Sequence, residues 1–141
     1  MKSFSADISA WVAKAKANAD AVVRQSVQDM AYRIIATSPV DTGYFRASWW
    51  ASLNGPGEHP QQPVKVAGRL AAAGGLGTAA EMAAVISQGK AGDRFYLLNN
   101  AAYAVTLEYG HSQQAPAGIV RPVVAAAPHI VADNIAKYGR R

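Results

Sequence analysis

The 141-residue sequence contains no cysteine. This absence excludes a disulfide framework, a zinc site with thiolate ligands and a cysteine nucleophile. The three histidines, His59, His111 and His129, do not stand at an i, i+4 spacing or at another spacing typical of metal ligands. We therefore expect no metal and no other cofactor.

Charged residues are also scarce, at 16% of the chain, while half of the residues are apolar. Such a chain is too hydrophobic and too weakly charged to be intrinsically disordered. Its length predicts one domain, spanning residues 1–141. Much of the apolar half is alanine, which buries little area per residue, and oligomerisation is one way to supply the missing burial.

Long apolar runs are missing as well. Asp7, Lys14 and Lys16 interrupt every apolar window near the N-terminus, so we expect neither a signal peptide nor a membrane span, and no membrane partner. The formal charge of +5 suits an anionic partner. The largest basic group, Arg140 and Arg141 with Lys137 one turn before, is interpreted as a solvated tail.

From Ser5 to about Thr37, apolar residues recur at steps of three and four, which predicts one amphipathic helix. Ser3 or Ser5 can cap its N-terminus, and Pro39 forbids the helical conformation at Ser38. The helix would be about 50 Å long, more than a compact domain of this size needs. Either part of it projects toward neighbouring subunits, or it kinks between residues 13 and 21.

The middle of the chain is rich in glycine, proline and alanine. A turn at 40–44 leads into a strand predicted at 45–53, and residues 54–77 are expected to form a long flexible loop. Residues 78–87 are predicted as a short helix, with Thr78 as its N-cap and Glu81 at the spacing of a capping box. The loop and the long first helix are the expected assembly elements.

The remaining elements are a strand at 94–99, a short helix or helical turn at 100–110 and a last helix at 120–138. The last helix is expected to be broken or restarted around Pro122 and Pro128. This order predicts an α+β fold with a long N-terminal helix, a small, mainly antiparallel sheet, short helices and a C-terminal helix.

Three stretches carry a resemblance. They read SPVDTGYFRAS at 38–48, FYLLNN at 95–100 before Tyr103, and LEYGHS at 107–112, followed by APAG at 115–118 and by Arg121. In this order they resemble the tail-component family of long-tailed bacteriophages, except that Phe45 replaces the usual aliphatic residue. The resemblance assigns structural roles to Asp41, Thr42, Gly43, Arg46, Asn99, Tyr103, Glu108, Tyr109, Gly110, Pro116 and Arg121.

The resemblance implies a non-enzymatic virion protein that completes the tail and joins it to the head. It implies a homo-oligomeric neck ring of six copies around the DNA channel, made in the host cytoplasm. The implied partners are the head-closure or connector proteins, the tail terminator and the tail tube, with non-specific contact to genomic DNA. The alternative is a basic, non-catalytic module that binds nucleic acid, for which the sequence shows no recognition motif.

Single residues also have local interpretations. Asp41 and Gly43 suit a turn, and Arg46 is expected to pair with Asp41 or Glu108. Glu108 stands among apolar neighbours, where a carboxylate needs a partner within the subunit, in a neighbouring subunit or, least expected, at a catalytic site.

Other residues are assigned to assembly or to backbone flexibility. Glu108, His111 and Ser112 lie too close in sequence to form a catalytic triad. The glycines Gly74, Gly75 and Gly77 are interpreted as a flexible hinge. Trp49 and Trp50 are expected to divide between the core and an outer surface, because successive strand residues point to opposite faces. The candidate assembly contacts are Trp11, Trp50, His59 and Arg69.

Overall fold

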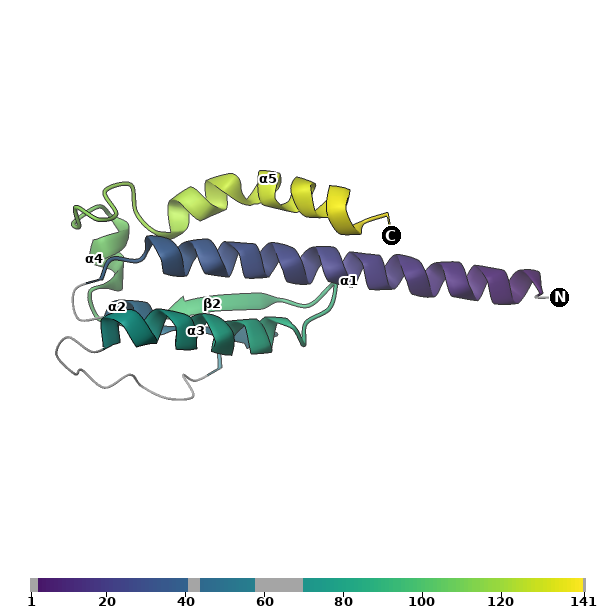
Figure 1. Ribbon diagram of the computed structural model, residues 1–141, viewed down its shortest axis with the longest axis horizontal. Coiled ribbons are helices and arrows are strands. Elements are labelled where there is room, and N and C mark those ends of the chain that lie inside the picture. The colour runs from purple at the N-terminus through teal and green to yellow at the C-terminus, as the bar shows by residue number, and fades with distance from the viewer. Residues whose placement is uncertain (1–2, 41–43, 58–69, 141) are drawn as a thin grey trace.

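A computed structural model describes residues 3–40, 44–57 and 70–140 of the chain. Its elements, in chain order, are α1 (Phe4–Thr37), α2 (Tyr44–Ala47), β1 (Trp49–Leu53), α3 (Leu70–Ile86), β2 (Phe95–Asn99), α4 (Ala104–Glu108) and α5 (Val120–Tyr138). Figure 1 shows α1 as the long axis, with α5 along one side and α3 and the sheet along the other. The predicted α+β fold is confirmed.

Helix α1 begins and ends where the sequence predicts. The Ser3 hydroxyl accepts a hydrogen bond from the Ala6 amide at 3.2 Å, and Ser38 leaves the helix with a ψ of 129° before Pro39. The helix is continuous, and its N-terminal part extends beyond the other elements (Figure 1). Helix α1 therefore projects beyond the rest of the domain, and the alternative kink between residues 13 and 21 is absent.

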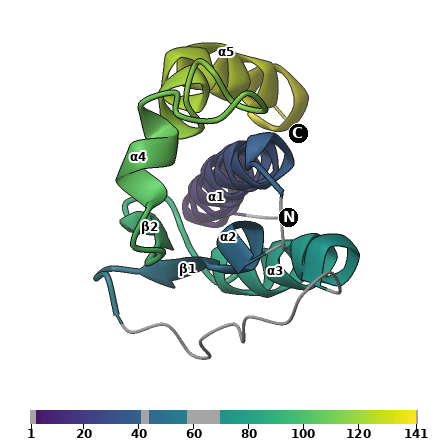
Figure 2. The same ribbon diagram turned by 90° about the vertical axis from the view of Figure 1, so that its left-hand side faces the viewer.

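The sheet consists of β1 and β2, which pair antiparallel from Trp49 opposite Asn99 to Leu53 opposite Phe95. A two-stranded sheet is marginal on its own and needs packing against other elements. Here α3 contacts α1, α2 and β1, so that it packs beside the β1 side of the sheet (Figure 2). The core includes Ile34, Ile35, Phe45, Trp49, Met82, Ile86, Ile119 and Val123.

The middle of the chain differs from the prediction. Tyr44–Ala47 forms a helical turn, so the strand begins only at Trp49. Helix α3 begins at Leu70, which makes the predicted loop wrong for residues 70–77 and places the expected glycine hinge inside a helix. Thr78 is buried within α3 and is not its N-cap. Residues 58–69 of the predicted loop lie outside the described residues.

Both tryptophans of β1 are buried, with Trp49 6% and Trp50 7% exposed, so the expected division between them is wrong. Trp49 belongs to the core, and its Nε1 donates to the Ser38 hydroxyl at 2.9 Å. Because successive strand residues point to opposite faces, each face of β1 is covered at these two residues. The turn after β1 folds back toward Trp50, since a Cβ at Gly57 would lie 3.5 Å from the Trp50 ring.

Helix α5 runs through both prolines without a break, contrary to the prediction. Pro122 stands in the first turn, where an amide has no partner within the helix. Pro128 is exposed, so water can bond to the Val124 carbonyl that lacks an amide partner.

Candidate functional site

The motif residues meet where α4 is followed by α5. The Glu108 carboxylate accepts hydrogen bonds from the amides of Ile119, the residue before α5, at 2.9 Å and of Val120 at 2.7 Å and Arg121 at 2.9 Å in α5. It also pairs with Nε of Arg121 at 3.2 Å. Glu108 therefore serves as the N-terminal cap of α5, where amides and the helix dipole favour a negative charge.

Two opposing effects set the pKa of Glu108. Burial raises the pKa of the carboxyl, but the hydrogen bonds from the backbone of Val120, Arg121 and Ile119 and from the Arg121 side chain together lower it further. The resulting pKa lies below the ordinary value of 4.5. Glu108 is therefore held as a carboxylate, and the prediction that it has a partner within the subunit is confirmed.

Arg121 closes this junction from outside. Its Nη2 donates to the Glu108 backbone carbonyl at 2.6 Å, and its guanidinium carbon lies 5.0 Å from the centre of the Tyr109 ring. Two glycines allow the close approach of the chains. Gly118 has a φ of +93°, and a Cβ there would lie 2.5 Å from the Glu108 carbonyl oxygen. Gly110 has a φ of +86°, and a Cβ there would lie 2.6 Å from the Pro116 carbonyl oxygen.

The first motif is tied to the end of α1. Nη2 of Arg46 donates to the Ser38 carbonyl at 2.8 Å, so the expected pairing of Arg46 with Glu108 is wrong. This bond satisfies a carbonyl that α1 leaves without a helical partner. Asp41, Thr42 and Gly43 lie outside the described residues. The predicted pairing of Arg46 with Asp41 therefore falls outside them as well.

The second motif joins the sheet to α2. The Asn99 amide donates to the Phe45 carbonyl at 2.9 Å, and its oxygen accepts from the Ala101 amide at 2.9 Å. The Tyr103 ring lies 5.9 Å from that of Phe45.

Sequence patterns did not reveal Gln114, which exchanges two hydrogen bonds with the backbone of Val40, at 2.9 and 3.1 Å. A glutamine in a polar loop carries no signal of such a contact. The three motifs thus form one framework that holds α1, β2 and α5 together.

Glu108 and Ser112, two of the three residues considered for a triad, both have hydrogen-bond partners other than His111. Both carboxylate oxygens of Glu108 accept from amides of α5, and the Ser112 hydroxyl accepts from the Gln114 amide. Within the described residues, no three His, Cys, Asp or Glu side chains are grouped so that they could hold a metal ion.

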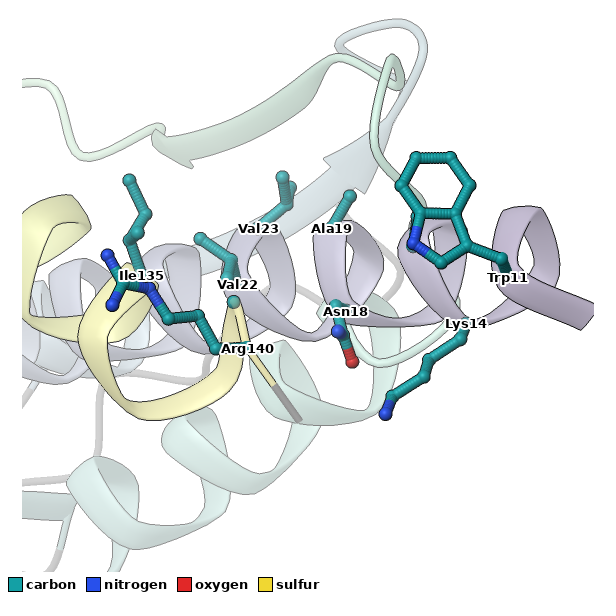
Figure 3. Close-up of a pocket in the computed structure, with 10 residues that line it drawn as sticks. Trp11, Lys14, Asn18, Ala19, Val22, Val23, Ile135 and Arg140 are labelled. Carbon is teal, nitrogen blue, oxygen red and sulfur yellow. The ribbon is translucent and has the colours of Figure 1, made fainter. Parts of the chain in front are cut away.

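A second feature is the projecting part of α1, which carries exposed apolar side chains. Phe4 is 82% exposed and Trp11 68%, with Ile8 and Val12 also exposed. Beside them lies an open groove of about 570 Å³ between α1 and the end of α5. Figure 3 shows it running along α1 from Trp11 to Val22, with Ile135 of α5 and Arg140, which follows α5, at the other end.

The other candidate assembly contacts are not exposed or not described. Trp50 is buried within the subunit, so it is not available as a surface contact. His59 and Arg69 lie outside the described residues. Trp11 stays a predicted contact.

Comparisons with family models, with curated proteins and with solved structures gave no match to this chain. None of the helices in the described part of the chain is long and apolar enough to cross a membrane.

Proposed function

We propose that the protein is a structural subunit of a tailed-bacteriophage particle, which completes the tail and joins it to the head. The observation that carries the proposal is the projecting part of α1, whose large apolar side chains are exposed. Large exposed apolar patches rimmed by polar residues are typical of sites where proteins bind one another. A helix that extends beyond its own domain suits assembly.

The assignment to a phage particle rests on the three motifs and their resemblance to the tail-component family. The described motif residues support a structural role, because Arg46, Asn99, Glu108 and Arg121 bind backbone groups of other elements. In the proposed ring, this framework fixes the shape of the subunit while α1 contacts neighbours. Such an interface is heterologous, because it joins two different surfaces. The rotation that relates neighbouring subunits sets the copy number, for which the resemblance implies six.

The proposed ring lies between the head-closure proteins and the tail terminator and tube. Its channel surrounds the DNA, and the net charge of +5 per subunit favours contact with phosphates without reading sequence. Synthesis in the host cytoplasm and a final place in the virion follow from this proposal.

Inactivating the gene in the phage genome that encodes it tests the function. We expect DNA-filled heads and complete tails that remain separate in electron micrographs, and joined particles again when the wild-type gene is supplied. Joined, infectious particles without the protein would overturn the proposal. Sequence-preferring binding of DNA by the purified protein would favour the nucleic-acid module instead.

A further inference from the structure

The apolar stripe of α1 that packs on α5 continues past the end of α5. Asn134 of α5 donates to the Ser26 hydroxyl of α1, and Ile135 lines the groove together with Val22. From Val22 toward the N-terminus, steps of three and four residues lead to Ala19, Ala15, Trp11, Ile8 and Phe4. Residues at these spacings share one helix face. α5 ends at Tyr138, so the same face becomes the floor of the groove.

The groove carries positive charge. Its charged lining residues are Lys14 on α1 and Arg140 after α5, and both are cations. Figure 3 shows Lys14 extending from α1 at the Trp11 end of the groove and Arg140, which follows α5, at the Ile135 end. A partner that suits this groove brings apolar side chains on one face and a carboxylate beside them.

The first turns of α1 have this chemistry. Phe4, Ile8 and Trp11 lie on one face, and Asp7 stands one turn before Trp11 on the same side. Asp7 is the only charged residue between Phe4 and Ala13. The first turns of α1 and the groove are therefore both apolar, and Asp7 is opposite in charge to the two cations of the groove.

Phe4 and Ile8, at the tip of this segment, cannot reach the Val22 end of the groove in their own chain, although Trp11 on the same helix already lines the near end. Ile8 and Val22 belong to one continuous helix and are separated by about 21 Å along its axis, at 1.5 Å per residue. Only another molecule can place Phe4 and Ile8 over this end of the groove.

We infer that the first turns of α1 from one copy of the chain dock in the α1–α5 groove of a second copy. The inference rests on the proposed function insofar as that function requires self-association. Phe4 and Ile8 of the incoming helix cover Ala15, Ala19 and Val22, and the carboxylate of Asp7 enters a groove whose charged residues, Lys14 and Arg140, are both cations. Each copy offers one segment and one groove, so the contact can repeat from copy to copy and close into a ring, or be exchanged between two copies in a closed dimer.

Cysteine crosslinking tests the contact, because the chain has no cysteine of its own. One population carries Ile8→Cys and the other Ile135→Cys, and the two are mixed under mild oxidation. A disulfide requires Cα atoms closer than about 7 Å, so a disulfide between positions 8 and 135 reports docking. The expected result is this mixed disulfide, identified by mass spectrometry.

The matched control replaces Ile135→Cys with Val124→Cys. Val124 is an exposed apolar residue of the same helix, three turns away from the groove. The control should give little mixed disulfide. Equal yields from positions 124 and 135 would overturn the inference.

Charge reversal gives an independent test by light scattering. Asp7→Lys should weaken self-association at least about tenfold, as for truncation of a central interface contact. Combining Asp7→Lys with Lys14→Glu and Arg140→Glu should restore most of the loss. All variants change exposed residues, and circular dichroism checks that they fold.

The outcomes separate this contact from the proposed function. A ring that forms without the mixed disulfide and is insensitive to charge reversal would overturn the contact and leave the ring. A closed dimer that shows both effects would support the contact and contradict the ring.

Discussion

Glu108 joins the motif framework to α5, and its charge matters for folding. Replacing it by Glu108→Gln removes a charged acceptor of three amides and of Arg121 while nearly keeping the shape. We expect the free energy of unfolding to fall by about 1–3 kcal/mol near neutral pH, the usual cost of losing hydrogen bonds to a charged group. Urea unfolding measures this difference.

The same residue predicts a dependence on pH. The folded-state pKa of Glu108 is below the ordinary value of 4.5, so its stabilising contribution is complete above that pH. It is lost as the pH falls below 4.5 and through the folded-state pKa. The stability difference between wild type and Glu108→Gln should therefore shrink from about pH 6 to about pH 3.

Glu81→Gln is the matched control for both measurements, since Glu81 is an exposed carboxylate on α3. It should change the unfolding free energy by less than about 0.5 kcal/mol. A constant difference between wild type and Glu108→Gln down to about pH 3 would contradict the role of the Glu108 charge.

The packing of α5 on α1 depends on a buried polar contact between the two helices. Asn134 is 2% exposed, and its amide donates to the Ser26 hydroxyl at 3.3 Å and to the Asp29 carboxylate at 2.9 Å. Asn134→Ala removes these bonds and leaves a cavity, so we expect a loss of about 1–3 kcal/mol in urea unfolding.

The neighbouring exposed residue provides the control for this helix contact. Asp133→Ala should cost less than about 0.5 kcal/mol, because its side chain lies on the outer side of α5. Equal losses for the two variants would mean that helix propensity, and not the contact with α1, explains the effect.

Elements with a strong period and clear end signals were predictable from sequence. α1 has apolar residues in steps of three and four along its length and Pro39 after its end, and the structure begins it one residue from the predicted start. β2 likewise begins one residue from its predicted start and ends at the predicted Asn99, because it is a short apolar run beside turn residues.

Elements that depend on tertiary packing were not predictable. Each glycine lowers helix stability by about 1 kcal/mol, so residues 70–77 looked like loop, but α3 packs on α1, α2 and β1 and is helical throughout. Trp49 and Trp50 were expected to divide between the core and an outer surface because successive strand residues point to opposite faces, yet Trp50 is buried as well. The turn that covers it has no apolar pattern of its own.

The candidate site was predictable in part. The chemistry of a half-buried carboxylate required a partner for Glu108, but its main partners are backbone amides, which every residue carries. Arg46 and Arg121 offered the same charge to Glu108, and only the fold shows that Arg46 binds the end of α1. Sequence thus identified the acid, while the three-dimensional path of the chain selected its partner.

At the scale of the whole molecule, net charge opposes the proposed assembly. Each copy carries +5, so neighbouring copies repel one another over a distance that salt shortens to about 10 Å at 0.1 M. The proposed contact itself is apolar with a close charge pair, which salt screens less than it screens the repulsion between whole subunits. Association should therefore be limited at low salt by the total charge.

We predict that self-association strengthens from about 10 mM to about 150 mM NaCl, as measured by light scattering at fixed protein concentration. Arg33→Glu provides the control, since Arg33 is an exposed residue of α1 outside the groove and its reversal lowers the net charge. This variant should associate more strongly at low salt and depend less on salt. Association that weakens steadily over the same range would contradict the prediction, because opposite charges and not apolar burial would then dominate the contact.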